Sequence, residues 1–166
     1  FITLRDVDIQ GRYMHHPISL SNCSHCLIQD FVIGAPHRHG TTISWGSHFN
    51  VFHRGAGNEL AMDAHRACSF RNLHQDILIE HGESPKQPLR SGGAYARGLH
   101  AARENVYWNI EHQFPNEGKP FQIKYLKQWP LGIFVGWHGN REIDITPALQ
   151  GQIVHDIGRE VSTSPF

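Results

Sequence analysis

A repeated pattern of short apolar–polar alternation runs through the first half of the chain and restricts the fold more than any other feature. The segment Ser24–Gly34 matches Ser47–Gly57, which aligns Ser24 with Ser47. The pattern extends back to the start of the chain, because Ile2–Ile9 matches Cys26–Ile33 at nearly the same spacing. Self-similarity at a fixed period predicts a repeat architecture.

A second series of matches precedes the first within each repeat. It consists of Ile18–Leu20, Ile43–Trp45 and Met62–Ala64, which align Ile18 with Ile43 and Ile43 with Met62. Segments this short cannot bury an apolar side alone, but stacked copies pair their backbones and build a continuous core. The leucine-rich repeat is excluded because its consensus is absent. A β-sandwich is disfavoured because hairpin signals such as Asn-Gly are missing between the runs. The sequence therefore predicts an all-β fold, a right-handed single-stranded parallel β-helix (a solenoid).

The three cysteines fit the interior of such a stack. They are an odd number, so they cannot all be paired within the chain. Cys23–Cys26 has the spacing of a zinc knuckle, but no second pair of ligands follows it. We predict small buried thiols, and an inward column of Ile2, Cys26, Phe49 and Cys68 would account for two of them.

The domain boundaries follow from where the repeat is interrupted. We expect coils over residues 1–140, with an excursion at about 80–98 where prolines and glycines are frequent. The repeat then returns at Val106–Ile110, which matches Ser69–Leu73 and aligns Asn109 with Asn72. Residues 141–166 are poorly periodic, and we expect them to form an irregular C-terminal tail or cap over the end of the stack.

Composition restricts the partners. The chain has 166 residues, 39% of them hydrophobic, and 15 basic and 15 acidic side chains, so it has no electrostatic signature of a nucleic-acid-binding protein. No apolar run has the length of a membrane span. The chain starts in a strand-like alternation without Met, and we expect it to be a processed chain or part of a longer protein or assembly.

The strongest candidate site lies in the second series of segments. If Met62 and Ala64 point into the core, the alternation directs Asp63 and His65 outward on the same side of the strand. Arg66 follows directly, and the residues expected beside these on neighbouring coils are small. The sequence thus predicts a shallow trough over parallel coils that would accept an extended polymer.

The residue types in this trough suit β-elimination on a uronic-acid polymer. That reaction needs a positive charge beside the substrate carboxylate, a base for the acidic proton and an acid for the leaving oxygen. Arg66 or Arg38 could neutralise the carboxylate, and His65 or His39 could be the base, with Asp63 orienting the imidazole. Further candidates for binding the substrate are Arg38, His37, Ser44 and Arg71.

Other functions remain open at this point. Hydrolysis is disfavoured because Asp63 has no obvious carboxylate partner on neighbouring strands. The 14 histidines could bring imidazoles of adjacent coils within ligand distance of Zn²⁺, Ni²⁺ or Cu²⁺, but no standard spacing supports a metal site, and none is assigned. A non-catalytic structural or adhesive β-helix, as in a filament, a cell wall or a fibre, is the main alternative.

The coil pattern resembles a known family. "ISLSNCSHCLIQDFVIG" is similar to the coils of pectate-lyase-like β-helix proteins, and "AMDAHRACSFRNLHQDILIEHG", "VYWNIE" and "GIFVGWHG" resemble the C-terminal coils of secreted proteins grouped with polysaccharide lyases. This resemblance implies a secreted protein that acts on or binds an acidic polysaccharide, in some cases with Ca²⁺. The sequence lacks the aspartate-rich calcium cluster of pectate lyases and the paired aspartates of polygalacturonases, so no catalytic residue is carried over.

Overall fold

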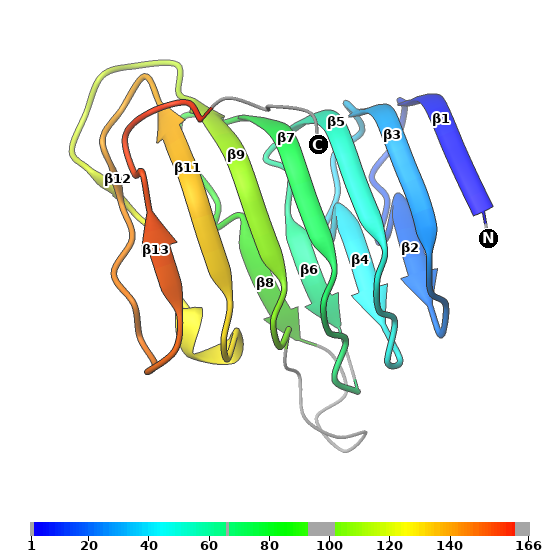
Figure 1. The fold of residues 1–166 in the computed structure, drawn as a ribbon. Coiled ribbons are helices and arrows are strands. Elements are labelled where there is room, and N and C mark those ends of the chain that lie inside the picture. Colours follow the sequence, from blue (N-terminus) through cyan, green and yellow to red (C-terminus); the bar gives the residue numbers. More distant parts are fainter. Residues whose placement is uncertain (1, 66, 93–101, 162–166) are drawn as a thin grey trace.

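The computed structural model describes residues 2–65, 67–92 and 102–161, and these form a parallel β-solenoid of about six turns. Figure 1 shows the strands stacked in order along one axis, from β1 at the N-terminus to β13 near the C-terminus. The predicted all-β parallel β-helix is thus confirmed. The described part of the chain contains no helix with the length and apolarity that a bilayer crossing requires.

Three parallel sheets make up the solenoid, and within each the neighbouring strands come from successive coils. The largest sheet contains β1 (Ile2–Ile9), β3 (Cys26–Ile33), β5 (Val51–Asn58), β7 (Leu73–Glu80), β9 (Val106–Gln113), β11 (Ile133–Gly139) and β13 (Ile153–His155). The second contains β2 (Ile18–Ser21), β4 (Thr41–Ser44), β6 (Met62–His65) and β8 (Leu89–Gly92). The third is the pair β10 (Phe121–Gln122) and β12 (Ile143–Asp144), and a short 3₁₀ turn, η2, covers Leu126–Gln128.

The register between coils differs from the sequence matches in three places. In the first, Leu27 pairs with Val51, whereas the sequence match aligned it with Asn50. The column of Cys26 therefore continues at Asn50, and the predicted inward Phe49 is 43% exposed. Ile2 pairs in register with Cys26 as predicted, and Cys26 is buried, but Phe49 and the exposed Cys68 do not continue the column, so the predicted four-residue inward column is wrong in its second half.

The other two differences concern the second sheet and β9. Ile43 pairs with Leu20 and Ala64, whereas the sequence matches aligned it with Ile18 and Met62. Val106 pairs with Leu73, although the match had aligned it with Ser69. Each of these shifts is by an even number of positions, which keeps a side chain on its predicted face. The inward positions of Met62 and Ala64 are consequently as predicted.

Two parts of the chain that were expected to be irregular, an excursion and a C-terminal tail or cap, contribute strands to the stack. Leu89–Gly92, inside the expected excursion, forms β8 and pairs with β6. In the C-terminal segment, β12 pairs with β10 and β13 pairs with β11. The parallel pairing therefore continues past residue 140 along the main sheet.

Each long strand of the main sheet bends at one residue in the left-handed backbone region. Six such residues follow one another from coil to coil and have φ between 50° and 65°: Asp6, Asp30, Arg54, Asp76, Asn109 and Gly136. Asp, Asn and Gly tolerate this conformation better than other residues. Arg54 is the exception, and its guanidinium forms two hydrogen bonds of 2.6 and 2.7 Å with the carboxylate of Asp30. At this bend the strands change direction, so the two halves of the sheet lie on different sides of the core.

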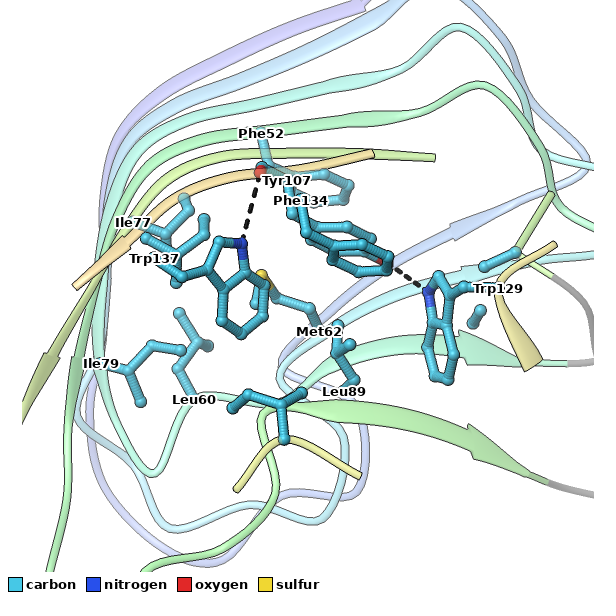
Figure 2. Packing of buried hydrophobic residues seen from close by; sticks show 14 of the residues in the cluster. Phe52, Leu60, Met62, Ile77, Ile79, Leu89, Tyr107, Trp129, Phe134 and Trp137 are labelled. Carbon is cyan, nitrogen blue, oxygen red and sulfur yellow. Dashed lines mark hydrogen bonds between the residues drawn. The ribbon is translucent and has the colours of Figure 1, made fainter. Parts of the chain in front are cut away.

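A column of rings runs through the core along the stacking axis (Figure 2). Phe52, His74, Tyr107 and Phe134 lie one above the other, with centroids 4.6, 5.1 and 5.5 Å apart and nearly parallel planes. Figure 2 labels three of these rings, Phe52, Tyr107 and Phe134. The indole N–H of Trp129 donates to the Tyr107 hydroxyl at 2.7 Å. His74 is fully buried, and this burial lowers its pKa to about 3, so it packs as a neutral ring.

Buried asparagines in successive coils form a ladder of hydrogen bonds at the turn that precedes the long strand of the main sheet. The side-chain carbonyl of Asn50 accepts the backbone N–H of Cys26 at 3.0 Å, and Asn72 accepts that of Asn50 at 3.1 Å. Asn105 continues the ladder by accepting the backbone N–H of Asn72 at 2.9 Å. All three asparagines are at most 1% exposed. The sequence match had aligned Asn72 with Asn109, whereas its structural counterpart is Asn105.

Candidate functional site

The candidate site lies on the outer face of the second sheet. Met62 and Ala64 of β6 are part of the core, so the intervening Asp63 and the following His65 project from the opposite face. Asp63 pairs in register with Thr42 of β4 and with Arg90 of β8. The outer face of three consecutive strands thus carries hydroxyl, carboxylate, imidazole and guanidinium groups.

Asp63 lies at the centre of a compact cluster of imidazoles. Its Oδ1 is 3.2 Å from Nδ1 of His39, and its Oδ2 is 3.1 Å from Nδ1 of His65. The Asp63 side chain has no exposed surface, and the side chains of the two histidines are each 9% exposed. Among the residues described, no hydrogen bond of good alignment reaches either carboxylate oxygen. Asp63 and His65 share one side of the strand as predicted, but they lie beneath other side chains and not in open water.

Two further histidines from the preceding coil cover this group. The ring of His15 stacks on that of His39 with centroids 5.2 Å apart, and the ring of His16 stacks on His39 at 4.7 Å. His16 also meets the ring of His65 edge-on at 5.3 Å, and its Nδ1 lies 2.9 Å from the Thr42 hydroxyl. Backbone pairing enforces the alignment, because the N–H of His39 donates to the carbonyl of His15. We call His15, His16, His39, Asp63 and His65 the histidine–aspartate cluster.

The electrostatics of the cluster follow from its burial and crowding. Burial raises the pKa of the Asp63 carboxyl, but the adjacent imidazoles of His39 and His65 outweigh this effect, and the resulting pKa is below its ordinary value. Burial, followed by the nearby His39, lowers the pKa of His16 to about 4. Asp63 is therefore ionised and His16 neutral at pH 7.

Two arginines lie near the cluster. Arg90 is the register neighbour of Asp63 in β8, and its guanidinium donates a hydrogen bond of 2.9 Å to the backbone carbonyl of Arg38. Arg38 directly precedes His39 and is exposed. The sequence had proposed Arg38 as a charge neutraliser, and Arg90 is a second candidate that the structure adds.

The remaining predicted site residues are distributed as follows. Ser44 is buried on the same outer face and pairs in register with His65. His37 is also buried, with Nδ1 2.9 Å from the carbonyl of Ala35, and burial lowers its pKa. Arg71 lies elsewhere, on the turn before β7, where it forms an ion pair with Glu104. Arg66 lies outside the described residues.

Arg71 contributes to a separate pocket of about 450 Å³. It is lined by Cys68, Phe70, Arg71, Arg103, Glu104 and Pro130. The carboxylate of Glu104 forms ion pairs with the guanidinium groups of both Arg71 and Arg103, so one negative charge faces two positive charges in this pocket. No described contact links the pocket to the histidine–aspartate cluster.

Sequence reasoning missed His15, His16 and Arg90. The step along the chain from His15 to His39 equals the step from Ile2 to Cys26, which pair in register. Extending the repeat to the short loop before Ile18 would have placed His15 and His39 one above the other. Arg90 could not be found in this way, because its strand lies within the expected excursion.

The donor atoms of the cluster define what it could bind. His39, Asp63 and His65 each offer one ligand atom within 4.8 Å of the others, and so do His15, His16 and His39. This nitrogen-rich set, with one carboxylate, does not fit Ca²⁺, which takes six to eight oxygen ligands. Cys23 and Cys26, whose spacing is that of a zinc knuckle, belong to neither group among the described residues.

The fold and the cluster together define the protein as a parallel β-solenoid with a histidine- and aspartate-rich site on the outer face of one sheet. Comparison with models of known protein families, with curated proteins and with solved structures finds no match. The function is therefore argued from the site itself.

Proposed function

We propose that the protein is a carbohydrate-active enzyme of the polysaccharide-lyase type that cleaves a uronic-acid-containing polysaccharide by β-elimination at the histidine–aspartate cluster. The observation that carries this proposal is a buried carboxylate, Asp63, that holds imidazoles on the outer face of a parallel sheet beside two arginines. Stacked coils form a long regular surface, which suits an extended polymer. The likeness of the coil pattern to secreted β-helix proteins supports the same substrate class and an extracellular location.

The chemistry assigns a role to each group. The base removes the proton from the carbon beside the uronate carboxylate, the electron pair forms a carbon–carbon double bond, and the bond to the glycosidic oxygen breaks. That oxygen then takes a proton, so the reaction consumes no water. A cation beside the carboxylate stabilises the negative charge that develops during proton removal.

The exposure of the imidazoles favours His16 as the base. His39 and His65, the bases proposed from sequence, are buried, whereas His16 is half-buried on the side of the cluster where His15 reaches solvent. The hydroxyl of Thr42 holds the His16 ring at Nδ1, which leaves Nε2 for the substrate. Arg38, which is exposed and directly precedes His39, is the candidate cation for the substrate carboxylate, and Arg90 donates a hydrogen bond to its backbone carbonyl.

The test is a cleavage assay on a panel of uronic-acid polymers that includes polygalacturonate, alginate and glucuronate-containing glycosaminoglycans. We expect ultraviolet absorbance from unsaturated chain ends with at least one of them. His16→Ala should lower the rate by about 100-fold or more, as expected for loss of a general base. His155→Ala is the matched control, since that side chain is 72% exposed on β13, and it should cleave at the wild-type rate.

Two results would overturn the proposal. Absence of cleavage with every polymer would favour the alternative of a structural or adhesive solenoid. Cleavage that is equally fast in the His16→Ala and His155→Ala proteins would show that the reaction takes place away from this cluster.

A further inference from the structure

We propose that His39, Asp63 and His65 form a binding site for a divalent transition metal ion of the Zn²⁺ type. This inference goes beyond the proposed function and does not depend on it, because it concerns binding by the cluster and not turnover of a polymer. The three residues come from two neighbouring coils and meet on the outer face of the second sheet.

The spacing of the donor atoms matches that of ligands around one ion. Zn²⁺ binds nitrogen and oxygen ligands at about 2.0–2.2 Å, so two ligands at tetrahedral or octahedral angles lie about 3.0–3.5 Å apart. The two imidazole Nδ1 atoms are 3.2 and 3.1 Å from the carboxylate oxygens of Asp63. Ordinary ion pairs reach the same distances, and the hydrogen bonding of the carboxylate distinguishes the two cases.

The second observation is the state of the Asp63 carboxylate. Its side chain is completely buried, and among the described residues neither oxygen receives a well-aligned hydrogen bond, although imidazole nitrogens lie within 3.2 Å of both. A buried carboxylate without aligned donors is costly unless a positive charge is close to it. A metal ion between the carboxylate and the two rings would supply that charge.

The imidazoles of the cluster are crowded around the same carboxylate. The ring centroid of His39 lies 4.7 Å from that of His16, 5.0 Å from that of His65 and 5.2 Å from that of His15. Imidazole is the commonest side-chain ligand for a transition metal, so this crowding places several ligands of one type around a single point.

The ligand types select the class of ion. Two imidazoles and one carboxylate suit Zn²⁺ and its neighbours Ni²⁺ and Cu²⁺ better than Ca²⁺ or Mg²⁺, which prefer oxygen ligands. Three protein ligands leave at least one coordination position for a further ligand. The His16 ring lies 4.7 Å from the His39 ring and 5.3 Å from the His65 ring, so it borders the three ligands.

The experiment measures metal binding directly on the whole chain. Protein freed of metal by chelation is titrated with Zn²⁺ in a calorimeter, and we expect about one ion bound per chain. The Asp63→Asn substitution keeps the shape of the side chain but removes its charge. We expect it to weaken Zn²⁺ binding by more than about 100-fold, because even the loss of an outer-shell partner costs roughly 10–100-fold. His155→Ala, as an exposed-histidine control, should bind like the wild type.

A second measurement does not depend on the folding of any variant. In crystals of the wild-type protein soaked with Zn²⁺, we expect an anomalous scattering peak between Asp63, His39 and His65. A peak only at other positions, the absence of binding in the calorimeter, or equal binding by folded Asp63→Asn protein would overturn the inference. Metal binding without polymer cleavage would overturn the proposed function alone, and cleavage without metal binding would overturn this inference alone.

Discussion

At the scale of single residues, the asparagine ladder shows how strongly one side chain can determine the shape of a turn. Asn72 accepts hydrogen bonds from the backbone N–H and the side-chain amide of Asn50, and its own amide donates to the carbonyls of Ser47 and Phe70. These groups are buried and have no access to water. An amide with one acceptor and two donor positions satisfies them together, which an apolar or a charged side chain cannot do.

The corresponding prediction concerns the substitution Asn72→Ala. It removes the acceptor of the buried Asn50 N–H and of the Asn50 side-chain amide, and the donor to the Phe70 carbonyl; an unsatisfied buried polar group costs about 1–3 kcal/mol. We expect the free energy of unfolding, measured by urea denaturation, to fall by about 2–4 kcal/mol, because more than one buried polar group loses a partner. Asn58→Ala is the control, because Asn58 is exposed and makes one long hydrogen bond of 3.4 Å to Gly34. A loss of equal size in both proteins would contradict the role of the ladder.

The same scale shows which parts of the site could be predicted from sequence. The outward direction of Asp63 and His65 followed from period-two alternation, which is a local property of one strand. Their burial did not follow, because it depends on His15 and His16 in another coil. The predicted register is wrong at Phe49, because the turns differ slightly in length and residues of similar type stand next to the position that actually pairs.

At the scale of elements, each strand of the main sheet from β5 to β11 contributes one ring to the column in the core. The ring from β7 is His74, and its Nε2 lies 3.1 Å from the hydroxyl of Thr41 in β4. This contact links the main sheet to the second sheet across the interior. In the folded protein His74 is a neutral ring. In the unfolded chain it binds a proton near the ordinary histidine pKa of 6.5, so protonation of His74 favours the unfolded chain.

This difference in protonation predicts an acid-sensitive stability. Above pH 6.5 the ring is neutral in both states and imposes no penalty. Between pH 6.5 and about 3 the unfolded chain alone takes up the proton, so His74 lowers the free energy of unfolding by about 1.4 kcal/mol per pH unit. His74→Phe keeps a ring in the column and should reduce the acid slope by this amount in denaturation curves measured from pH 7 to pH 4.

The substitution has a cost of its own, because it leaves the Thr41 hydroxyl without its partner. The relevant quantity is therefore the slope against pH and not the stability at pH 7, which we expect to fall. His155→Phe on the exposed side of β13 serves as the control and should leave the slope unchanged. If His74→Phe also leaves the slope unchanged, the acid sensitivity arises from other groups.

At the scale of the whole molecule, the stack must end without exposing a long strand edge. β13 pairs with β11 over Ile133, Phe134 and Val135, and the N–H of Gly158 donates to the carbonyl of Trp137 at 2.8 Å. At the bend of β11, Gly136 has no side chain, and a Cβ there would lie 2.4 Å from Val161. The segment after residue 140 thus pairs with β11 and adds the short β13 as the final strand of the main sheet.

Removal of this segment tests its importance. A chain truncated after Asn140 presents the unpaired edge of β11 together with the apolar groups that β13 covers. Such edges pair with other chains, so we expect concentration-dependent association in size-exclusion chromatography with light scattering. Adding Val135→Lys to the truncated chain places a charge at the edge and should restore monomers. A truncated chain that stays monomeric without this lysine would contradict the role of the segment.

The fluorescence of two buried tryptophans reports on the last coils of the solenoid. One of them, Trp129, donates a hydrogen bond to the Tyr107 hydroxyl. Both Trp129 and Trp137 are fully buried in the last coils, far along the stack from β1. If the coils separate one after another from the C-terminal end, indole emission will shift before the far-ultraviolet circular dichroism of the remaining strands is lost. Coincident transitions would instead mean that the stack melts as a single cooperative unit.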